Sequence, residues 1–246
     1  MKLKYSAITY TPKEKEINQD SYYADNSGGL YIISDGIGSY KQSETASQLI
    51  VKIIPDELER ERLEEKSDIK RILHSVIKTA ATELNKIGSQ NPLLRKISAT
   101  MTLLFIHNEK YWIAQVGDSR AYLFRNNCLK QITEDHSVAF EQYKAGAIKK
   151  EDIPSHPNQK LLTRSFSAVK NFVSSDIFEN KIRDNDIFLL CSDGLTKEVN
   201  DTEISEVLKT ESDITKNAKQ LLDKVKLCNG EDDTTIILIQ LNCGTE

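Results

Sequence analysis

The sequence predicts a layered α+β fold. Strand-like segments and longer amphipathic helices occur in blocks along the 246 residues, and strands do not alternate strictly with helices. The segment 107–111, "HNEKY", is typical of a hairpin turn, so the strands on either side of it are expected to be antiparallel. No Gly/Pro/Ser-rich linker divides the chain. We therefore expect residues 1–246 to form a single domain.

Seven segments have the composition of β-strands, since they are apolar, mostly rich in β-branched or aromatic residues, and bounded by turn residues. Two of them end in the same tripeptide, Ser-Asp-Gly, at residues 34–36 and 192–194. The tripeptides do not mark an internal repeat, because a helix pair follows the first and a short mixed segment follows the second. The expected strands are 3–10, 30–34, 99–107, 111–117, 120–124, 187–192 and 234–241.

Three segments carry apolar residues at helical spacing. Residues 46–54 and 69–87 are expected to form two helices joined by a close connection, and residues 214–225 form a third. Each helix has one apolar face and one polar face, so each is expected to cover a sheet.

The composition excludes several classes of protein. A hydrophobic content of 39% and a charged content of 28% are those of a soluble globular chain, and no segment approaches the length of a membrane span or a signal peptide. The net charge of -4 and the interleaving of basic with acidic residues argue against nucleic-acid or membrane partners. The four cysteines lack zinc-site or disulfide spacing. A cytoplasmic protein with reduced thiols is expected.

Four aspartates share one context, because each lies beside a predicted strand, and the segment 17–23, "INQDSYY", adds a fifth. The four are Asp35, Asp118, Asp193 and Asp232, and the fifth is Asp20. A single Asp-Gly after a strand is usually only a turn, but five such positions weaken that interpretation. Carboxylates brought to one place repel one another unless cations neutralise them, and ligation by oxygen alone favours magnesium or manganese over zinc. The pattern predicts a metal site at the strand ends.

From about residue 17 to residue 241, the sequence resembles the metal-dependent serine/threonine protein phosphatases of type 2C. Several of the motifs are weak individually, but all occur in the order expected for this family. They are "NQDS" at 18–21, "SDGIG" at 34–38, "VGDSRAYL" at 116–123, "ITEDHS" at 132–137, "LLTRSF" at 161–166, "LLCSDGL" at 189–195 and "DDTTIILI" at 232–239.

The resemblance implies a four-layer α/β/β/α sandwich, with two mainly antiparallel sheets flanked by helices and two manganese or magnesium ions at one end. By position, Asp35 would bridge both ions and the carbonyl oxygen of Gly36 would bind one of them. Asp193 and Asp232 would complete the shell of the other ion. A water that bridges two such cations is acidic enough to supply a hydroxide-like nucleophile near neutral pH.

Two further acids have positions in the same pattern. Asp20 would contact its ion directly or through water, and Asp118 resembles the ligand of a third, weaker ion found in many relatives. The activity implied is hydrolysis of phosphoserine and phosphothreonine in phosphoproteins, with a separate serine/threonine kinase as the expected counterpart.

The sequence departs from the family at the phosphate site. The position five residues before Asp20 is commonly an arginine that grips the phosphate, and here it is Lys15, which offers a point charge without the planar fork. Lys15 joins Asp35 and Asp193 as an expected catalytic residue, with Lys13 or another cation as an alternative phosphate ligand. Ile37 stands where some relatives carry a proposed general-acid histidine, which leaves leaving-group protonation to a metal-bound water.

Two residues near these motifs are expected to be structural. His136 is interpreted as a hydrogen-bonding residue and Arg164 as an ion-pair partner. Two alternatives to the phosphoprotein phosphatase remain open at this point. One is a pseudophosphatase that binds phosphoproteins or regulates a kinase, and the other is a phosphatase of small phosphate esters.

Overall fold

The two β-sheets of the protein pack face to face. The structure, a computed structural model, describes residues 2–38, 42–61, 63–211 and 213–242. One sheet is five-stranded with the order β1-β12-β11-β7-β8, and every pairing in it is antiparallel. Its strands are β1 (Lys2–Tyr10), β7 (Arg120–Arg125), β8 (Cys128–Gln131), β11 (Ile187–Cys191) and β12 (Thr234–Asn242).

The second sheet is seven-stranded with the order β10-β6-β5-β3-β4-β9, and β2 pairs with β3 beside this path. Its pairings are antiparallel as well. Its strands are β2 (Asp20–Asp25), β3 (Leu30–Ile37), β4 (Ser98–Ala99), β5 (Met101–His107), β6 (Lys110–Val116), β9 (Phe166–Ser167) and β10 (Asp176–Lys181).

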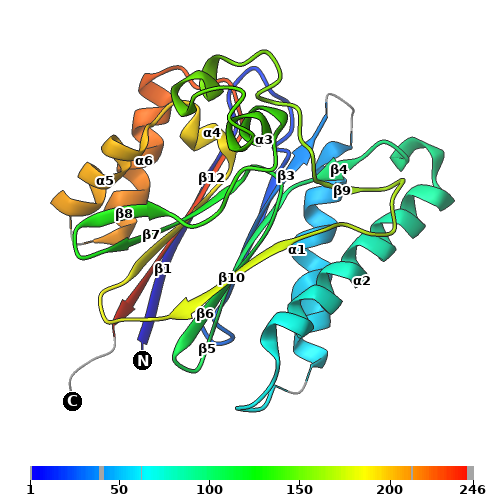
Figure 1. The fold of residues 1–246 in the computed structure, drawn as a ribbon, viewed down its shortest axis with the longest axis horizontal. Helices are drawn as coiled ribbons and strands as arrows, with labels where there is room; N and C mark the ends of the chain where they lie inside the picture. The colour runs from blue at the N-terminus through cyan, green and yellow to red at the C-terminus, as the bar shows by residue number, and fades with distance from the viewer. Residues whose placement is uncertain (1, 39–41, 62, 212, 243–246) are drawn as a thin grey trace.

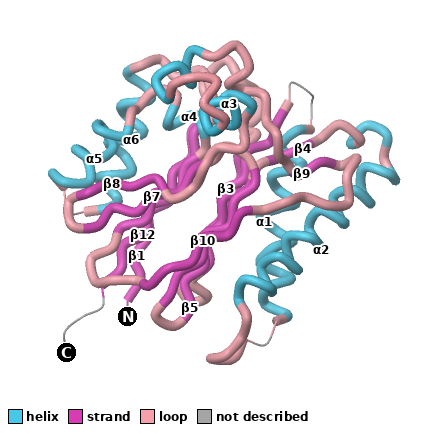
Figure 2. Tube along the Cα trace, in the orientation of Figure 1, coloured by secondary structure: helices cyan, strands magenta, loops and turns pink. Residues whose placement is uncertain are grey.

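Helices cover the outer face of each sheet, as Figure 1 shows. The pair α1 and α2 lies on the seven-stranded sheet, and α5 and α6 lie on the five-stranded sheet beside the short α4. Figure 2 shows the two strand layers between these helical layers. The helical elements are α1 (Ser43–Arg60), α2 (Ile69–Gln90), η1 (Pro92–Leu94), α3 (Val138–Lys144), η2 (Lys150–Ser155), α4 (Asp193–Thr196), α5 (Asp201–Thr210) and α6 (Ile214–Leu227).

Three apolar cores hold the four layers together. Along β3, Leu30 and Ile32 pack under α1 and α2, while Tyr31 and Ile33 point into the core between the sheets. Successive side chains of a strand alternate between its faces, so a strand buried on both sides must be apolar at every position. This explains why the central strands are continuous hydrophobic runs. The third core lies between the five-stranded sheet and its own helices.

The helix boundaries follow local capping chemistry. The Asp68 side chain accepts a hydrogen bond from the backbone N–H of Arg71 at the start of α2, and Asp213 does the same for Thr215 at the start of α6. Such caps satisfy N–H groups that have no partner within the helix. None of the helices in the described part of the chain combines the length and apolar character needed to cross a membrane.

The expected α+β class, the α/β/β/α layering and all seven expected strands are confirmed. The helices expected at 46–54, 69–87 and 214–225 are also present, and α1 begins three residues earlier than expected. Strands β2, β8, β9 and β10 were not expected. Strand β10, "DIFENK", lies at a sheet edge with its last three residues exposed, so it lacks the apolar run that marks the central strands.

Candidate functional site

The two Ser-Asp-Gly tripeptides lie in different sheets. The first ends β3 of the seven-stranded sheet, and the second follows β11 of the five-stranded sheet and opens α4. The hydroxyl of Ser34 donates to the carbonyl oxygen of Thr100 at 2.7 Å, within its own sheet. The hydroxyl of Ser192 donates to Oδ2 of Asp20 at 2.7 Å, across to the other sheet. The repeated motif therefore delivers one aspartate from each sheet to the same end of the sandwich.

Asp20 and Asp35 are direct cross-strand neighbours, because they face each other in the β2–β3 register. The backbone N–H of Asp35 donates to Oγ1 of Thr100 at 3.0 Å, which fixes the end of the strand. Gly36 follows in a crowded place, since a Cβ there would lie 2.4 Å from the carbonyl oxygen of Ser43. Only glycine lets the backbone pass this point without displacing α1.

A second close approach brings Asp193 to the start of β12. A Cβ on Gly194 would lie 2.1 Å from the carbonyl oxygen of Asp233, so residues 193–194 lie directly against residues 232–233. The backbone N–H of Ser192 also donates to the carbonyl oxygen of Thr235 at 3.1 Å. These contacts place the carboxylates of both segments at one location.

Three buried acids, Asp20, Asp118 and Asp35, resist ionisation. Burial raises the pKa of Asp20 to about 7. The charges of Asp233 and Asp193 add to this rise, and hydrogen bonds to Asp20 oppose it. Burial and the charge of Asp193 raise the pKa of Asp118 to about 7. Burial, followed by the charge of Asp20, raises the pKa of Asp35 well above its usual range. Mutual repulsion in a poorly solvated place has this effect on carboxylates, and cations relieve it.

Three oxygens of the cluster fit an added cation. Oδ1 of Asp20, Oδ1 of Asp193 and Oδ1 of Asp233 are buried and have no hydrogen-bond partner within the described structure. An unpartnered buried carboxylate oxygen is costly, whereas a hard divalent cation accepts such oxygens as ligands. In the described residues, no three Asp, Glu, His or Cys side chains are already arranged around one point as a metal shell. The donor set therefore fits magnesium or manganese chemically, with side-chain adjustment on binding.

Two lysines hold part of the cluster. Nζ of Lys15 forms an ion pair with Oδ1 of Asp232 and lies 3.1 Å from Oδ2 of Asp233. Nζ of Lys197 lies 2.5 Å from Oδ2 of Asp193 and 2.6 Å from Oδ2 of Asp232. Although burial raises the pKa of Asp232, the hydrogen bonds from Lys15 and Lys197 outweigh it and hold that pKa at about 2.

The structure thus brings together Lys15, Asp20, Asp35, Asp193 and Asp232. Asp118 precedes Ser119, whose hydroxyl lies 2.8 Å from the Oγ1 of Thr100 that accepts the backbone N–H of Asp35. Sequence reasoning gave no role to Ser192 or Lys197, and it treated Asp233 only as one more acid near the site. Asp233 is only 3% exposed, and its Oδ2 accepts the backbone N–H of Gln19 at 3.1 Å. The doubled acid in "DDTT" was the available signal for Asp233, whereas the contacts of Lys197 become visible only in three dimensions.

His136 and Arg164 have the structural roles that the sequence indicated. Nδ1 of His136 accepts the backbone N–H of Gly117 at 3.1 Å, and its Nε2 lies 3.1 Å from Oδ2 of Asp176. Nη1 of Arg164 donates to the other oxygen of Asp176 at 2.7 Å. The imidazole is 2% exposed, and its burial lowers the pKa of His136. His136 therefore fixes the loop before α3.

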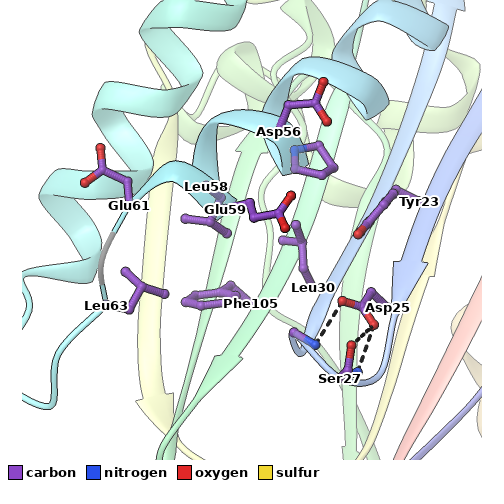
Figure 3. Close-up of a pocket in the computed structure, with 12 residues that line it drawn as sticks. Tyr23, Asp25, Ser27, Leu30, Asp56, Leu58, Glu59, Glu61, Leu63 and Phe105 are labelled. Atoms are coloured by element: carbon purple, nitrogen blue, oxygen red, sulfur yellow. Dashed lines mark hydrogen bonds between the residues drawn. The ribbon is translucent and has the colours of Figure 1, made fainter.

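A cavity of about 470 Å³ lies at the opposite end of β3 from Asp35 (Figure 3). Its lining combines apolar residues, among them Leu30 and Phe105, with the acids Asp56 and Glu59. Asp25 is occupied locally, because it accepts hydrogen bonds from Ser27 and Gly28. The cavity contains none of the clustered aspartates described above, so it is separate from the candidate site.

The protein is an α/β/β/α sandwich in which aspartates from both sheets meet at one end. Comparison with known proteins identifies the family that has this architecture. Residues 10–226 match the family described as Protein phosphatase 2C. The chain belongs to this family.

Named relatives cover most of the chain. It is 31% identical over 239 residues to "Serine/threonine phosphatase stp" of Listeria welshimeri, spanning 90% of this chain and 91% of that protein. It is 28% identical over 236 residues to "Serine/threonine protein phosphatase PstP" of Mycobacterium tuberculosis, spanning 96% of this chain and 44% of that one.

Solved structures share the fold. The crystal structure of the Mycobacterium tuberculosis phosphatase PstP/Ppp superposes with a TM-score of 0.90 at 27% identity, covering 98% of this chain and 100% of that one. The crystal structure of the catalytic domain of PstP in complex with 2 manganese ions superposes with a TM-score of 0.86 at 25% identity. The match covers 98% of this chain and 99% of that one.

Proposed function

We propose that this protein is a manganese- or magnesium-dependent phosphatase that hydrolyses phosphoserine and phosphothreonine in phosphoproteins. The observation that carries the proposal is the convergence of buried aspartates from both sheets, three of which keep an unpartnered carboxylate oxygen in the described structure. Family membership and relatives named as serine/threonine phosphatases support the same activity.

The metal ligands proposed are Asp20, Asp35, Asp193, Asp232 and the carbonyl oxygen of Gly36. Two ions are proposed, because PstP, a structural relative, binds 2 manganese ions. These residues would hold the ions, whose chemistry there would be to lower the pKa of a bound water and so make it nucleophilic near neutral pH. The protein contributes rigid placement, since Asp35 ends a central strand and Asp193 begins a helix that packs on β12.

Lys15 is proposed to bind the substrate phosphate. Its ammonium group already lies beside Asp232 and Asp233, at the edge of the acid cluster, and its side chain is 29% exposed. The charges and hydrogen bonds of Asp232 and Asp233 outweigh burial and raise the pKa of Lys15 above its ordinary value. The side chain therefore remains a cation that attracts a phosphate oxygen.

The proposal extends to the substrate, the enzyme that phosphorylates it and the location of the protein. We propose a phosphoprotein as substrate, a separate serine/threonine kinase as the enzyme that creates the phosphosite, and the cytoplasm as the location. We also propose that residues 1–246 act as one catalytic domain.

The test is metal-dependent hydrolysis of p-nitrophenyl phosphate and of a phosphothreonine peptide, before and after treatment with EDTA. Asp35→Ala and Asp193→Asn are expected to abolish both reactions with unchanged circular dichroism. Asp223→Asn, on the exposed face of α6, is the matched control and should retain normal rates. A protein that binds manganese and hydrolyses neither substrate would contradict the proposal, and hydrolysis of the small ester alone would contradict the phosphoprotein substrate.

A further inference from the structure

The cavity of about 470 Å³ between α1 and the seven-stranded sheet has the features of a second binding site (Figure 3). Its lining comes from β2, β3, β5 and α1 and from the segments that follow β2 and α1. Cavities that bind ligands have volumes of roughly 300–1,000 Å³, and this one falls within that range. None of the proposed metal ligands lines it, so a molecule bound here would be separate from a substrate at the acid cluster.

The apolar part of the lining is buried. Leu30 of β3 and Phe105 of β5 are partners in the strand register, and Leu58 of α1 belongs to the same apolar core. Each of these three side chains is at most 5% exposed. An apolar side chain that packs against them leaves water, which is favourable. The cavity can therefore hold an apolar side chain of a ligand.

The acidic part of the lining is not balanced by basic residues. Four carboxylates line the cavity, and its lining within the described part of the chain includes no lysine, arginine or histidine. Asp56, Glu59 and Glu61 are exposed, and their side chains form no hydrogen bond or ion pair with another described residue. The fourth acid, Asp25, accepts hydrogen bonds within its own turn. The cavity is therefore complementary in charge to a cationic ligand.

Tyr23 shows that acids from two elements act on the same space. It lies on β2 together with Asp25, whereas Asp56 and Glu59 lie on α1 (Figure 3). Burial, followed by the charges of Asp25, Glu59 and Asp56, raises the pKa of Tyr23. A cationic side chain in this space would therefore meet carboxylates from both elements.

One side of the cavity is formed by a strand at the edge of the sheet. Among the described residues β2 pairs with β3 alone, so its other edge has no strand partner. Such an edge binds extended protein segments through its unpaired backbone groups. In an extended segment, residues two positions apart point to the same side, so one apolar residue and the cations two positions before and after it can face the cavity together.

We propose that this cavity is a docking site for a short basic segment of a partner protein. The segment binds in an extended conformation, its central apolar side chain packs against the buried apolar lining, and arginine or lysine side chains on either side meet the exposed carboxylates. This inference goes beyond the proposed function, since it concerns a cavity without metal ligands and needs no catalytic step.

The experiment measures binding of fluorescein-labelled peptides Gly-Arg-Ser-Xaa-Ser-Arg-Gly to the full chain by fluorescence anisotropy, with Leu, Phe or Trp at Xaa. At least one of them is expected to bind, and more weakly as sodium chloride is raised, because salt screens charge pairs. Gly at Xaa, or Glu in place of both Arg residues, should weaken binding by about tenfold or more. Exchanging each Arg with the neighbouring Ser, which turns the cations to the other side of an extended chain, should also weaken it.

The variant Asp56→Lys/Glu59→Lys tests the place of binding. Both residues are exposed on α1, so the fold should be retained, and affinity should fall by about tenfold because two charge pairs become repulsive. Asp56→Asn/Glu59→Gln should give a smaller loss in the same direction. Glu206→Lys/Asp223→Lys is the matched control, since it makes the same change in charge at exposed positions of α5 and α6 and should leave affinity unchanged.

Four results would overturn the inference. They are an absence of binding by all three peptides, equal binding by the Asp56/Glu59 variants and the control, binding of spermine or of the Gly-centred peptide as tight as that of the apolar peptides, and equal binding after the Arg and Ser residues are exchanged. Analytical ultracentrifugation covers the remaining occupant. Self-association of the wild-type protein that Asp56→Lys/Glu59→Lys abolishes would assign the cavity to a second copy of this chain and not to a partner segment.

Discussion

The hydroxyl of Ser192 donates to Oδ2 of Asp20 at 2.7 Å and so ties the end of one sheet to the start of a strand in the other. The same hydroxyl oxygen accepts the backbone N–H of Thr235 at 2.9 Å. Because partners behind a metal ligand fix its orientation, we expect Ser192→Ala to weaken manganese binding by about 10- to 100-fold. It should also lower the free energy of unfolding by about 1–3 kcal/mol, since Thr235 loses its acceptor.

Ser34→Ala is the matched control for Ser192→Ala. Ser34 occupies the same place in the other Ser-Asp-Gly tripeptide, but its hydroxyl donates to the carbonyl oxygen of Thr100 and not to an acid. We expect a similar loss of stability and little change in manganese affinity, measured by calorimetry and chemical denaturation. An equal loss of affinity in both variants would show that Ser192 has no specific action on Asp20.

Asp20 gives the metal-free protein a characteristic dependence on pH. Its pKa is raised from an ordinary 3.8 to about 7 in the folded state, mainly by burial. Between these values the folded protein holds a proton that the unfolded chain has lost, so the contribution of Asp20 to stability falls as pH rises from about 4 to about 7. Asp20→Asn removes this contribution.

The measurement is thermal unfolding in EDTA at several pH values. Relative to wild type, Asp20→Asn should gain stability steadily from pH 5 to pH 7. The difference between the two proteins should level off above pH 7, where both states of the wild type have lost the proton. A difference that stays constant across this range would contradict the raised pKa of Asp20.

Asp35 and Asp193 were predictable because each follows an apolar run within a Ser-Asp-Gly tripeptide, which is a local signal, whereas Asp20 was indicated by the motif "NQDS". The cross-sheet bond of Ser192 and the bridge formed by Lys197 were not predictable, since they depend on segments about 35 residues or more apart meeting in space. Edge strand β10 was missed for a different reason. Its exposed polar residues do not need the apolar pattern by which central strands are recognised.

Lys15→Arg tests the departure from the family at the phosphate site. The guanidinium offers a fork that binds two phosphate oxygens, whereas the ammonium of Lys15 is a single point charge. One additional charge-assisted hydrogen bond contributes about 1.5 kcal/mol, which corresponds to roughly a tenfold lower KM for a phosphothreonine peptide. Lys110→Arg is the control, because Lys110 is exposed and pairs with Glu179 on the strand pair β6–β10, away from the acid cluster. An unchanged KM in Lys15→Arg would show that Lys15 serves the acids Asp232 and Asp233 and not the substrate.

His136→Ala separates a structural histidine from a catalytic one. Nδ1 of the ring accepts the backbone N–H of Gly117, and Nε2 forms a hydrogen bond with Asp176. In the variant, the N–H of Gly117 and the carboxylate of Asp176 each lose this partner. We expect the free energy of unfolding to fall by about 2–4 kcal/mol, as for other buried hydrogen-bonding groups. Removal of a general acid costs about 100- to 10,000-fold in rate. Because His136 is structural, kcat at 20 °C should change far less than this.

Chemical denaturation and the pH profile of kcat provide the readouts. A large fall in kcat together with loss of the acidic or basic limb of that profile would assign His136 to proton transfer, whereas an unchanged profile in a less stable protein agrees with its burial beside Asp176.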